Sequence, residues 1–161
     1  MMRKILANAC VVCALPFLGA CATASLESQT KTLDQREARI YFLRDSTLLY
    51  FGGTPNLKVN GQEVGRVANG SYFFVDRPPG TYTVTLETPL TPGRFAAEVK
   101  LRPGAIYYVQ VSPRVENYVI SVSAGLVGQL IEAAVVENSG AYGLTPLDEK
   151  AGAALLQKLK G

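Results

Sequence analysis

The sequence predicts a mainly β domain: an antiparallel β-sandwich or an open barrel of about eight short strands, with one or two C-terminal helices. Three observations lead to this prediction. Asn-Gly and Pro-Gly pairs recur between short extended runs, and apolar residues alternate with polar ones inside several of those runs. The last part of the chain loses this alternation and shows apolar residues at helical spacing. Short strands at this density, separated by Gly and Pro turns, are typical of sandwiches and barrels.

Residues 1–20 have the organisation of a lipoprotein signal peptide. Arg3 and Lys4 precede the apolar stretch 5–18, and small residues lead up to Cys21. The stretch is shorter than the roughly 20 apolar residues that span a bilayer, which argues against an uncleaved anchor. A plain secretory peptide needs no cysteine at the cut, so we expect cleavage before Cys21 and lipidation of Cys21. By resemblance to enteric lipoproteins, Ala22 favours the outer membrane, facing the periplasm.

Cleavage changes the cysteine and charge counts. Cys10 and Cys13 form a C-x-x-C pair, but both lie in the segment to be removed, so no disulfide is expected in the mature chain. Loss of Arg3 and Lys4 reduces the 16 basic side chains to 14, against 13 acidic ones. A nearly neutral surface without a Lys/Arg cluster gives no support for nucleic-acid binding.

Residues 21–37 are expected to form the lipidated cysteine and a flexible tether. Residues 22–37 are polar, contain no glycine and show no two-residue alternation. A flexible chain of this length has a root-mean-square reach of roughly 20 Å.

The β domain is predicted over residues 38–123. Residues 38–44 are rich in β-branched and aromatic side chains, and residues 81–88 and 94–101 alternate apolar and polar positions. Residues 72–75 and 105–111 are almost continuously apolar or aromatic, as expected for strands covered on both faces. The predicted strands are 38–44, 57–60, 62–67, 71–75, 81–88, 94–101, 105–112 and 118–122.

Turn residues separate these strands. Asn-Gly at a two-residue hairpin tip favours a type I′ turn, because both central residues of that turn need positive φ. Pro-Gly pairs indicate further reversals. The residues interpreted as turn formers are Asn60, Gly61, Asn69, Gly70, Pro79, Gly80, Pro103 and Gly104.

Residues 124–161 are predicted to be a helical extension packed on the β domain. Residues 124–136 lack proline and carry apolar residues at helical spacing, such as Leu126 and Leu130. Thr145 followed by Pro146 resembles a capped helix start, and Leu147 opens an apolar i+4 series. In the alternative reading, the apolar segment 124–136 docks on lipid or on a partner.

Five segments carry a resemblance to a known family: residues 38–44, 59–66, 69–75, 79–84 and 103–109. In this order they resemble the bacterial lipoproteins grouped as domain of unknown function 2846. The resemblance implies a lipid-anchored, β-sandwich-like domain and no particular activity.

The sequence favours a noncatalytic binding or structural module of the cell envelope. The chain contains no histidine, which excludes Ser-His-Asp triads, Cys-His pairs and histidine metal sites, and we expect no catalytic residue, metal or cofactor. A small envelope hydrolase using carboxylates is the competing class. Besides the membrane, the expected partner is an envelope protein or a glycan. An aromatic groove for such a partner would be lined by Tyr41, Tyr72, Tyr82, Tyr107 and Tyr108.

Overall fold

The computed structural model of the chain describes residues 25–47, 53–89, 91–114 and 132–161. Within these ranges the chain forms nine strands and one helix. They are β1 (Ala38–Arg44), β2 (Asn56–Val59), β3 (Gln62–Arg66), β4 (Ser71–Arg77), β5 (Gly80–Thr88), β6 (Thr91–Leu101), β7 (Ile106–Pro113), β8 (Glu132–Asn138), β9 (Tyr142–Leu147) and α1 (Glu149–Lys160).

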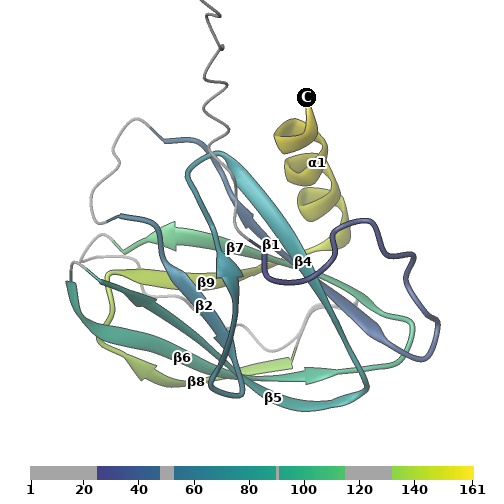
Figure 1. Cartoon of the computed structure of the whole chain (residues 1–161), viewed down its shortest axis with the longest axis horizontal. Helices are drawn as coiled ribbons and strands as arrows, with labels where there is room; N and C mark the ends of the chain where they lie inside the picture. The colour runs from purple at the N-terminus through teal and green to yellow at the C-terminus, as the bar shows by residue number, and fades with distance from the viewer. Residues whose placement is uncertain (1–24, 48–52, 90, 115–131) are drawn as a thin grey trace, which may run out of the picture.

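The strands form a β-sandwich of two sheets (Figure 1). The first sheet has the order β4-β1-β7-β9, and the second has the order β3-β2-β5-β6-β8. The mainly β prediction is therefore confirmed, and the described strands give a sandwich rather than an open barrel. The arrangement is not wholly antiparallel, because β1 and β7 pair in parallel. Between them the chain crosses to the second sheet and returns twice, so no hairpin fixes their relative direction.

The core lies between the two sheets. Alternate residues of each strand point into it, as the period-two pattern requires. From the first sheet come Ile40, Phe42, Phe73, Val75 and Val109; from the second come Leu57, Val84, Leu86, Phe95 and Val99, all of them buried.

The predicted helix over 124–136 is wrong where the structure describes it. Residues 132–138 form β8, which pairs with β6, and residues 142–147 form β9, which pairs with β7. The boundary between a β domain ending at 123 and a helical extension 124–161 therefore does not hold, because both sheets gain an edge strand from the C-terminal part. A short apolar run fits a helix and a strand equally well, and pairing with β6 decides between them. Leu126, Leu130 and the predicted strand 118–122 lie outside the described residues.

The last helix begins later than predicted. Thr145 and Pro146 belong to β9, where Pro146 pairs with Val109, and Asp148 is the N-cap, its carboxylate accepting a hydrogen bond from Ala151 N at 2.7 Å. Pro146 is tolerated in β9 because this is an edge strand, where one side of the backbone needs no partner. The α1 residues that are buried are Gly152 and Leu156.

The predicted turn formers occupy different kinds of connection. Asn60 and Gly61 lie between β2 and β3 with φ of 50° and 80°, the conformation that a type I′ turn needs. Gly70 has φ of 68°, whereas the Asn69 side chain is hydrogen-bonded to both Thr47 N and Thr47 O at 3.1 Å. The remaining pairs, Pro79 with Gly80 and Pro103 with Gly104, lie where β4 leads to β5 and β6 leads to β7.

Residues 25–37, which we call the strap, are docked on the domain, so the prediction of a flexible tether is wrong over this range. An isolated bridge joins Ser25 to Gly65 of β3, and Leu26 N donates to Val64 O at 3.1 Å. The strap then passes along the outer side of the first sheet, where Figure 1 shows it near β4. A polar segment without alternation gave no sign of these contacts, because they join residues far apart in the sequence.

Candidate functional site

The outer face of the first sheet carries aromatic and charged side chains instead of a uniformly polar surface. Strand alternation places Arg39 and Tyr41 of β1 on this face, since Ile40 and Phe42 point into the core. The register aligns Tyr41 with Phe74 of β4 and with Tyr108 of β7. Three rings therefore form a row across three neighbouring strands.

The rings of this row contact one another. Tyr41 stacks on Tyr108 with centroids 5.4 Å apart and an interplanar angle of 10°, and its edge-to-face partner is Phe74 at 5.5 Å. Helix α1 lies over the Tyr108 end of the row, and a Cβ at Gly152 would overlap the Tyr108 ring, so only glycine permits this close approach. Burial, with Tyr41 and Glu149 nearby, raises the pKa of Tyr108. The helix thus closes one end of the row and leaves Tyr41 half-buried.

Arg39 is a buried arginine paired with a buried carboxylate. Its Nε and Nη2 donate to the two oxygens of Asp76 at 2.7 and 2.8 Å, and the guanidinium lies 3.7 Å from the centroid of the Phe74 ring. Nη2 also donates to Lys31 O at 2.6 Å. The hydrogen bonds to Asp76 raise the pKa of Arg39 above its usual value. Two strands and the strap are therefore joined through one side chain.

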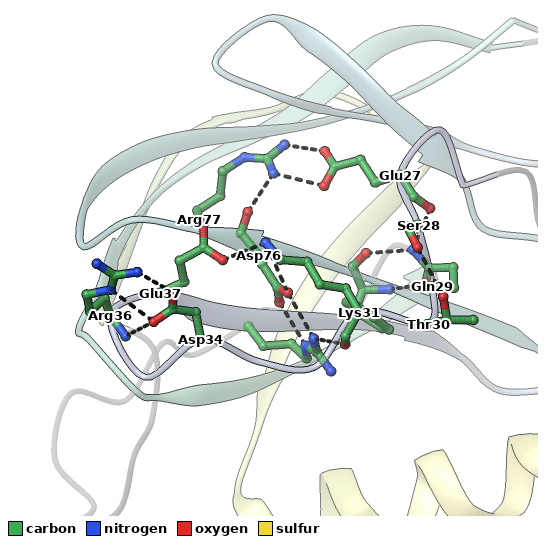
Figure 2. Close-up of polar contacts among 12 residues, drawn as sticks. Glu27, Ser28, Gln29, Thr30, Lys31, Asp34, Arg36, Glu37, Asp76 and Arg77 are labelled. Atoms are coloured by element: carbon green, nitrogen blue, oxygen red, sulfur yellow. Dashed lines mark hydrogen bonds and ion pairs between the residues drawn. The ribbon is translucent and has the colours of Figure 1, made fainter.

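The strap is held to β4 by side chains that reach across the sequence (Figure 2). Arg77 donates to both oxygens of Glu27, at 2.5 and 3.0 Å. The side-chain amide of Gln29 pairs with the backbone of Phe74 in the way that a neighbouring strand would. Its Oε1 accepts from Phe74 N at 2.8 Å, and its Nε2 donates to Phe74 O at 3.0 Å. Because β4 is the edge of its sheet, Gln29 satisfies backbone groups that would otherwise face solvent.

Two lysines approach this face from opposite sides. Lys31 of the strap donates to Glu37 at 2.7 Å, and its Nζ lies 3.9 Å from Asp76. The hydrogen bond to Glu37 is the main cause of a raised pKa for Lys31, whose side chain is still 49% exposed. Lys160, in the last turn of α1, has its Nζ 6.0 Å from the centroid of the Tyr72 ring. Both ammonium groups are thus in contact with water and near the aromatic face.

Together these elements enclose a cleft of about 440 Å³. Its floor is the outer face of β1 and β4, one wall is the strap, and the end of α1 stands opposite. The lining residues are Gln29, Thr30, Lys31, Arg39, Tyr41, Tyr72, Phe74 and Lys160. Ring faces with ammonium groups beside them suit a ligand that has apolar faces and an anionic group.

The structure brings together part of the predicted groove. Tyr41 and Tyr72 line the cleft, and Tyr108 stacks behind Tyr41 under the helix. Tyr107 lies in the core between the sheets, and its hydroxyl accepts from Arg102 N at 3.1 Å, because it alternates with Tyr108. Tyr82 is on the second sheet, where its hydroxyl donates to Pro78 O at 2.9 Å. Tyr82 and Tyr107 therefore do not belong to the cleft.

Sequence reasoning missed the polar residues of the cleft. Gln29, Thr30 and Lys31 lie in the range predicted to be a tether, and Lys160 lies in the predicted helical extension, where nothing pointed to a cleft. One signal was present in the sequence: Arg39 lies inside a predicted strand and Asp76 directly follows another, both strands are mostly apolar or aromatic, and charged residues in such places usually have a partner.

The described ranges contain no group of three or more Cys, Asp or Glu side chains placed to hold a metal ion. No helix within them has the length and apolarity needed to cross a membrane. Cys21 lies outside the described residues.

The sequence model of the family described as protein of unknown function (DUF2846) matches residues 34–125. The chain therefore belongs to this family, and the matched range includes β1, β4 and β7, which form the floor of the cleft and the ring row beside it. Comparisons with curated proteins and with solved structures find no match.

Proposed function

We propose that this DUF2846 protein is a noncatalytic, lipid-anchored module of the bacterial envelope, facing the periplasm, that binds an anionic glycan in the cleft of the first sheet. The observation that carries the proposal is the cleft itself, with Tyr41, Tyr72 and Phe74 on its floor and Lys31 and Lys160 at its sides. The anchor is supported by the sequence, in which a basic start and an apolar stretch lead to Cys21.

The carboxylates beside the cleft support binding rather than catalysis. Both oxygens of Asp76 accept hydrogen bonds from Arg39, and Glu37 accepts one from Lys31. A glycoside hydrolase needs two carboxyl groups that face each other across the scissile bond, one of them able to donate a proton. Neither Asp76 nor Glu37 is among the residues that line the cleft. The hydrolase alternative therefore has no support at this site.

A glycan fits the cleft better than an extended peptide. Peptides are commonly bound by adding a strand to an open sheet edge. At Phe74 the edge of β4 is already used by the Gln29 amide. The partly exposed rings of Tyr41 and Tyr72, by contrast, are suited to the apolar faces of sugar rings, and the lysines supply cations for a carboxylate on the sugar.

A titration of residues 22–161 with an oligogalacturonate, a soluble oligomer of a uronic acid, tests this proposal. We expect amide resonances of Tyr41, Tyr72 and Phe74 to shift, and we expect Lys31→Gln combined with Lys160→Gln to weaken binding about tenfold, since two exposed charge contacts together contribute about 1.4 kcal/mol. Lys150→Gln is the matched control, because Lys150 is an exposed lysine of α1 that does not line the cleft.

Two further ligands decide the chemical class. A neutral chito-oligosaccharide should bind more weakly than the oligogalacturonate, and a polyglutamate peptide should leave the cleft resonances in place. The assignment of the cleft would be contradicted if the double lysine variant bound the oligogalacturonate as tightly as the wild type. It would also be contradicted if only amide resonances on other faces of the domain shifted. Cleft shifts with polyglutamate but none with the oligogalacturonate would show that the ligand is an acidic peptide and overturn the glycan proposal.

A further inference from the structure

The docked part of the chain begins very close to the expected anchor. Ser25 is already bridged to Gly65 of β3, and Leu26 N is hydrogen-bonded to Val64 O. Only four residue steps separate Ser25 from Cys21, and even a fully extended chain covers at most about 14 Å in that distance. If all of residues 22–37 were a flexible linker, the domain would instead turn freely at roughly 20 Å from its attachment point.

We propose that the docked strap holds the β3 edge of the domain against the lipid headgroups, with Leu26 in contact with the membrane surface. This inference rests on the lipid at Cys21 that the proposed function includes. It adds an orientation: the domain is presented to the periplasm with a fixed edge toward the bilayer, and the cleft, whose wall is the same strap, keeps a fixed position relative to the membrane.

Leu26 is suited to this contact. Leu26 is 67% exposed although its backbone is hydrogen-bonded to β3. An apolar side chain is therefore exposed to solvent at the start of the strap. Apolar side chains near an anchor add to membrane affinity when they enter the headgroup region.

The charged residues near this edge neutralise one another. Glu27 is paired with Arg77, and Arg66 lies 3.6 Å from Glu63. With acids and bases paired, the edge has little net attraction for anionic lipid. The partner we infer is therefore the bilayer surface in general, and the contact should be similar on zwitterionic and anionic membranes.

The absence of tryptophan from the chain permits a direct test. The full lipidated protein carrying Leu26→Trp is reconstituted into phosphatidylcholine vesicles with brominated acyl chains, which quench tryptophan at the membrane. Val136→Trp is the matched control: Val136 is a 64% exposed apolar residue of β8, at the opposite edge of the same sheet from β3. Four strand spacings of about 4.8 Å separate these edges, roughly 19 Å.

We expect quenching several-fold stronger for Leu26→Trp than for Val136→Trp, and little change when anionic lipid is added. Insertion of a ten-residue Gly-Ser segment between Ala24 and Ser25 should lower the Leu26→Trp quenching toward the control. Equal quenching at both positions, or quenching that the insertion leaves unchanged, would overturn the inference.

The mass of the purified protein separates this inference from the proposed function. An acylated protein with equal quenching at both positions would contradict only the orientation. A protein without acyl mass at Cys21 would contradict the anchor of the proposed function and the orientation that rests on it.

Discussion

Strand β1 carries two buried arginines on opposite faces. Arg39 lies on the outer face, paired with the carboxylate of Asp76 and stacked on Phe74. Arg44 lies on the inner face and is 1% exposed. Its Nη1 donates to Val67 O at 3.0 Å and to Gly53 O at 3.3 Å, and its Nη2 donates to the hydroxyl of Tyr142 at 2.8 Å. Five residues apart, the two side chains must point in opposite directions, because strand residues alternate.

Their partners show what each face does. Arg44 donates to neutral oxygens from three separate segments, including Tyr142 of β9, so this side chain ties these segments together on the inner face. Arg39 is joined to an acid and to the strap at the margin of a cleft that is open to water. The inner arginine therefore serves the fold, whereas the outer arginine helps to line the cleft in which we propose that a glycan binds.

The largest effect is expected from Arg44→Ala. The substitution leaves a cavity and removes the arginine donor from the buried carbonyl of Val67, from the oxygen of the Tyr142 hydroxyl and from Gly53 O, which keeps the Tyr142 hydroxyl as its other donor. We expect a loss of roughly 3 to 5 kcal/mol in the free energy of unfolding, measured by denaturant melts of residues 22–161. Tyr142→Phe, which removes a single hydroxyl, should cost about 1 to 2 kcal/mol. A loss below that of Tyr142→Phe would contradict the role given to Arg44.

A smaller effect is expected from Asp76→Asn. It leaves the Arg39 guanidinium without its carboxylate, but the adjoining cleft lets water reach part of the charge. We expect a loss of about 2 to 3 kcal/mol. The double change Arg39→Met with Asp76→Leu should restore stability to within about 2 kcal/mol of wild type, since neither charge is then left unpaired.

The same kind of double replacement should fail to restore stability on the inner face. Arg44→Met with Tyr142→Phe leaves Val67 O without the Arg44 donor and removes both donors to Gly53 O, so the double variant should be no more stable than Arg44→Met. Two results would show that the two arginines are not held in the different ways described. One is an Arg44→Met, Tyr142→Phe variant that is more stable than Arg44→Met, and the other is additive losses of unfolding free energy from Arg39→Met and Asp76→Leu.

The smallest effect is expected from Arg36→Ala in the strap, and it concerns how stability depends on pH. Side-chain and backbone hydrogen bonds from Arg36 lower the pKa of Asp34 to about 2. Since this folded pKa lies below the ordinary value near 3.9, the contact contributes stability above about pH 4 that is lost as the pH falls toward 2. An NMR titration of the Asp34 carboxyl should have its midpoint near 2, and Arg36→Ala should raise it toward the ordinary value. A midpoint unaffected by Arg36→Ala would contradict the contact.

Much of the fold could be predicted from the sequence because it is encoded locally. The β-branched and aromatic content of residues 38–44 predicted the bounds of β1 to the residue, and Asn60-Gly61 located a hairpin, since both signals depend on neighbouring residues. The segment 132–138 could not be assigned in this way: Val135 and Val136 are compatible with a helix or a strand, and pairing with β6 decides. The parallel pairing of β1 with β7 also depends on tertiary context.

Less of the site could be predicted, for the same reason. Tyr41 and Tyr72 were recognisable as aromatic strand residues, but alternation alone did not reveal that Tyr107 would face the core. Gln29 and Lys31 reach their positions through hydrogen bonds to residues far along the chain, such as Phe74, and a polar segment carries no periodic signal of such contacts.

The docking of the strap on the outer face is tested most directly by hydrogen exchange at one amide. Phe74 N–H lies on the edge strand β4 and donates to the side chain of Gln29. In residues 22–161 we expect the Phe74 amide to be protected from exchange, and we expect Gln29→Ala to remove most of that protection while leaving the core amide of Val109 unchanged. A Phe74 amide that exchanges as fast as a solvent-exposed one in the wild type, or protection that survives Gln29→Ala, would contradict the docked strap and the cleft that it walls.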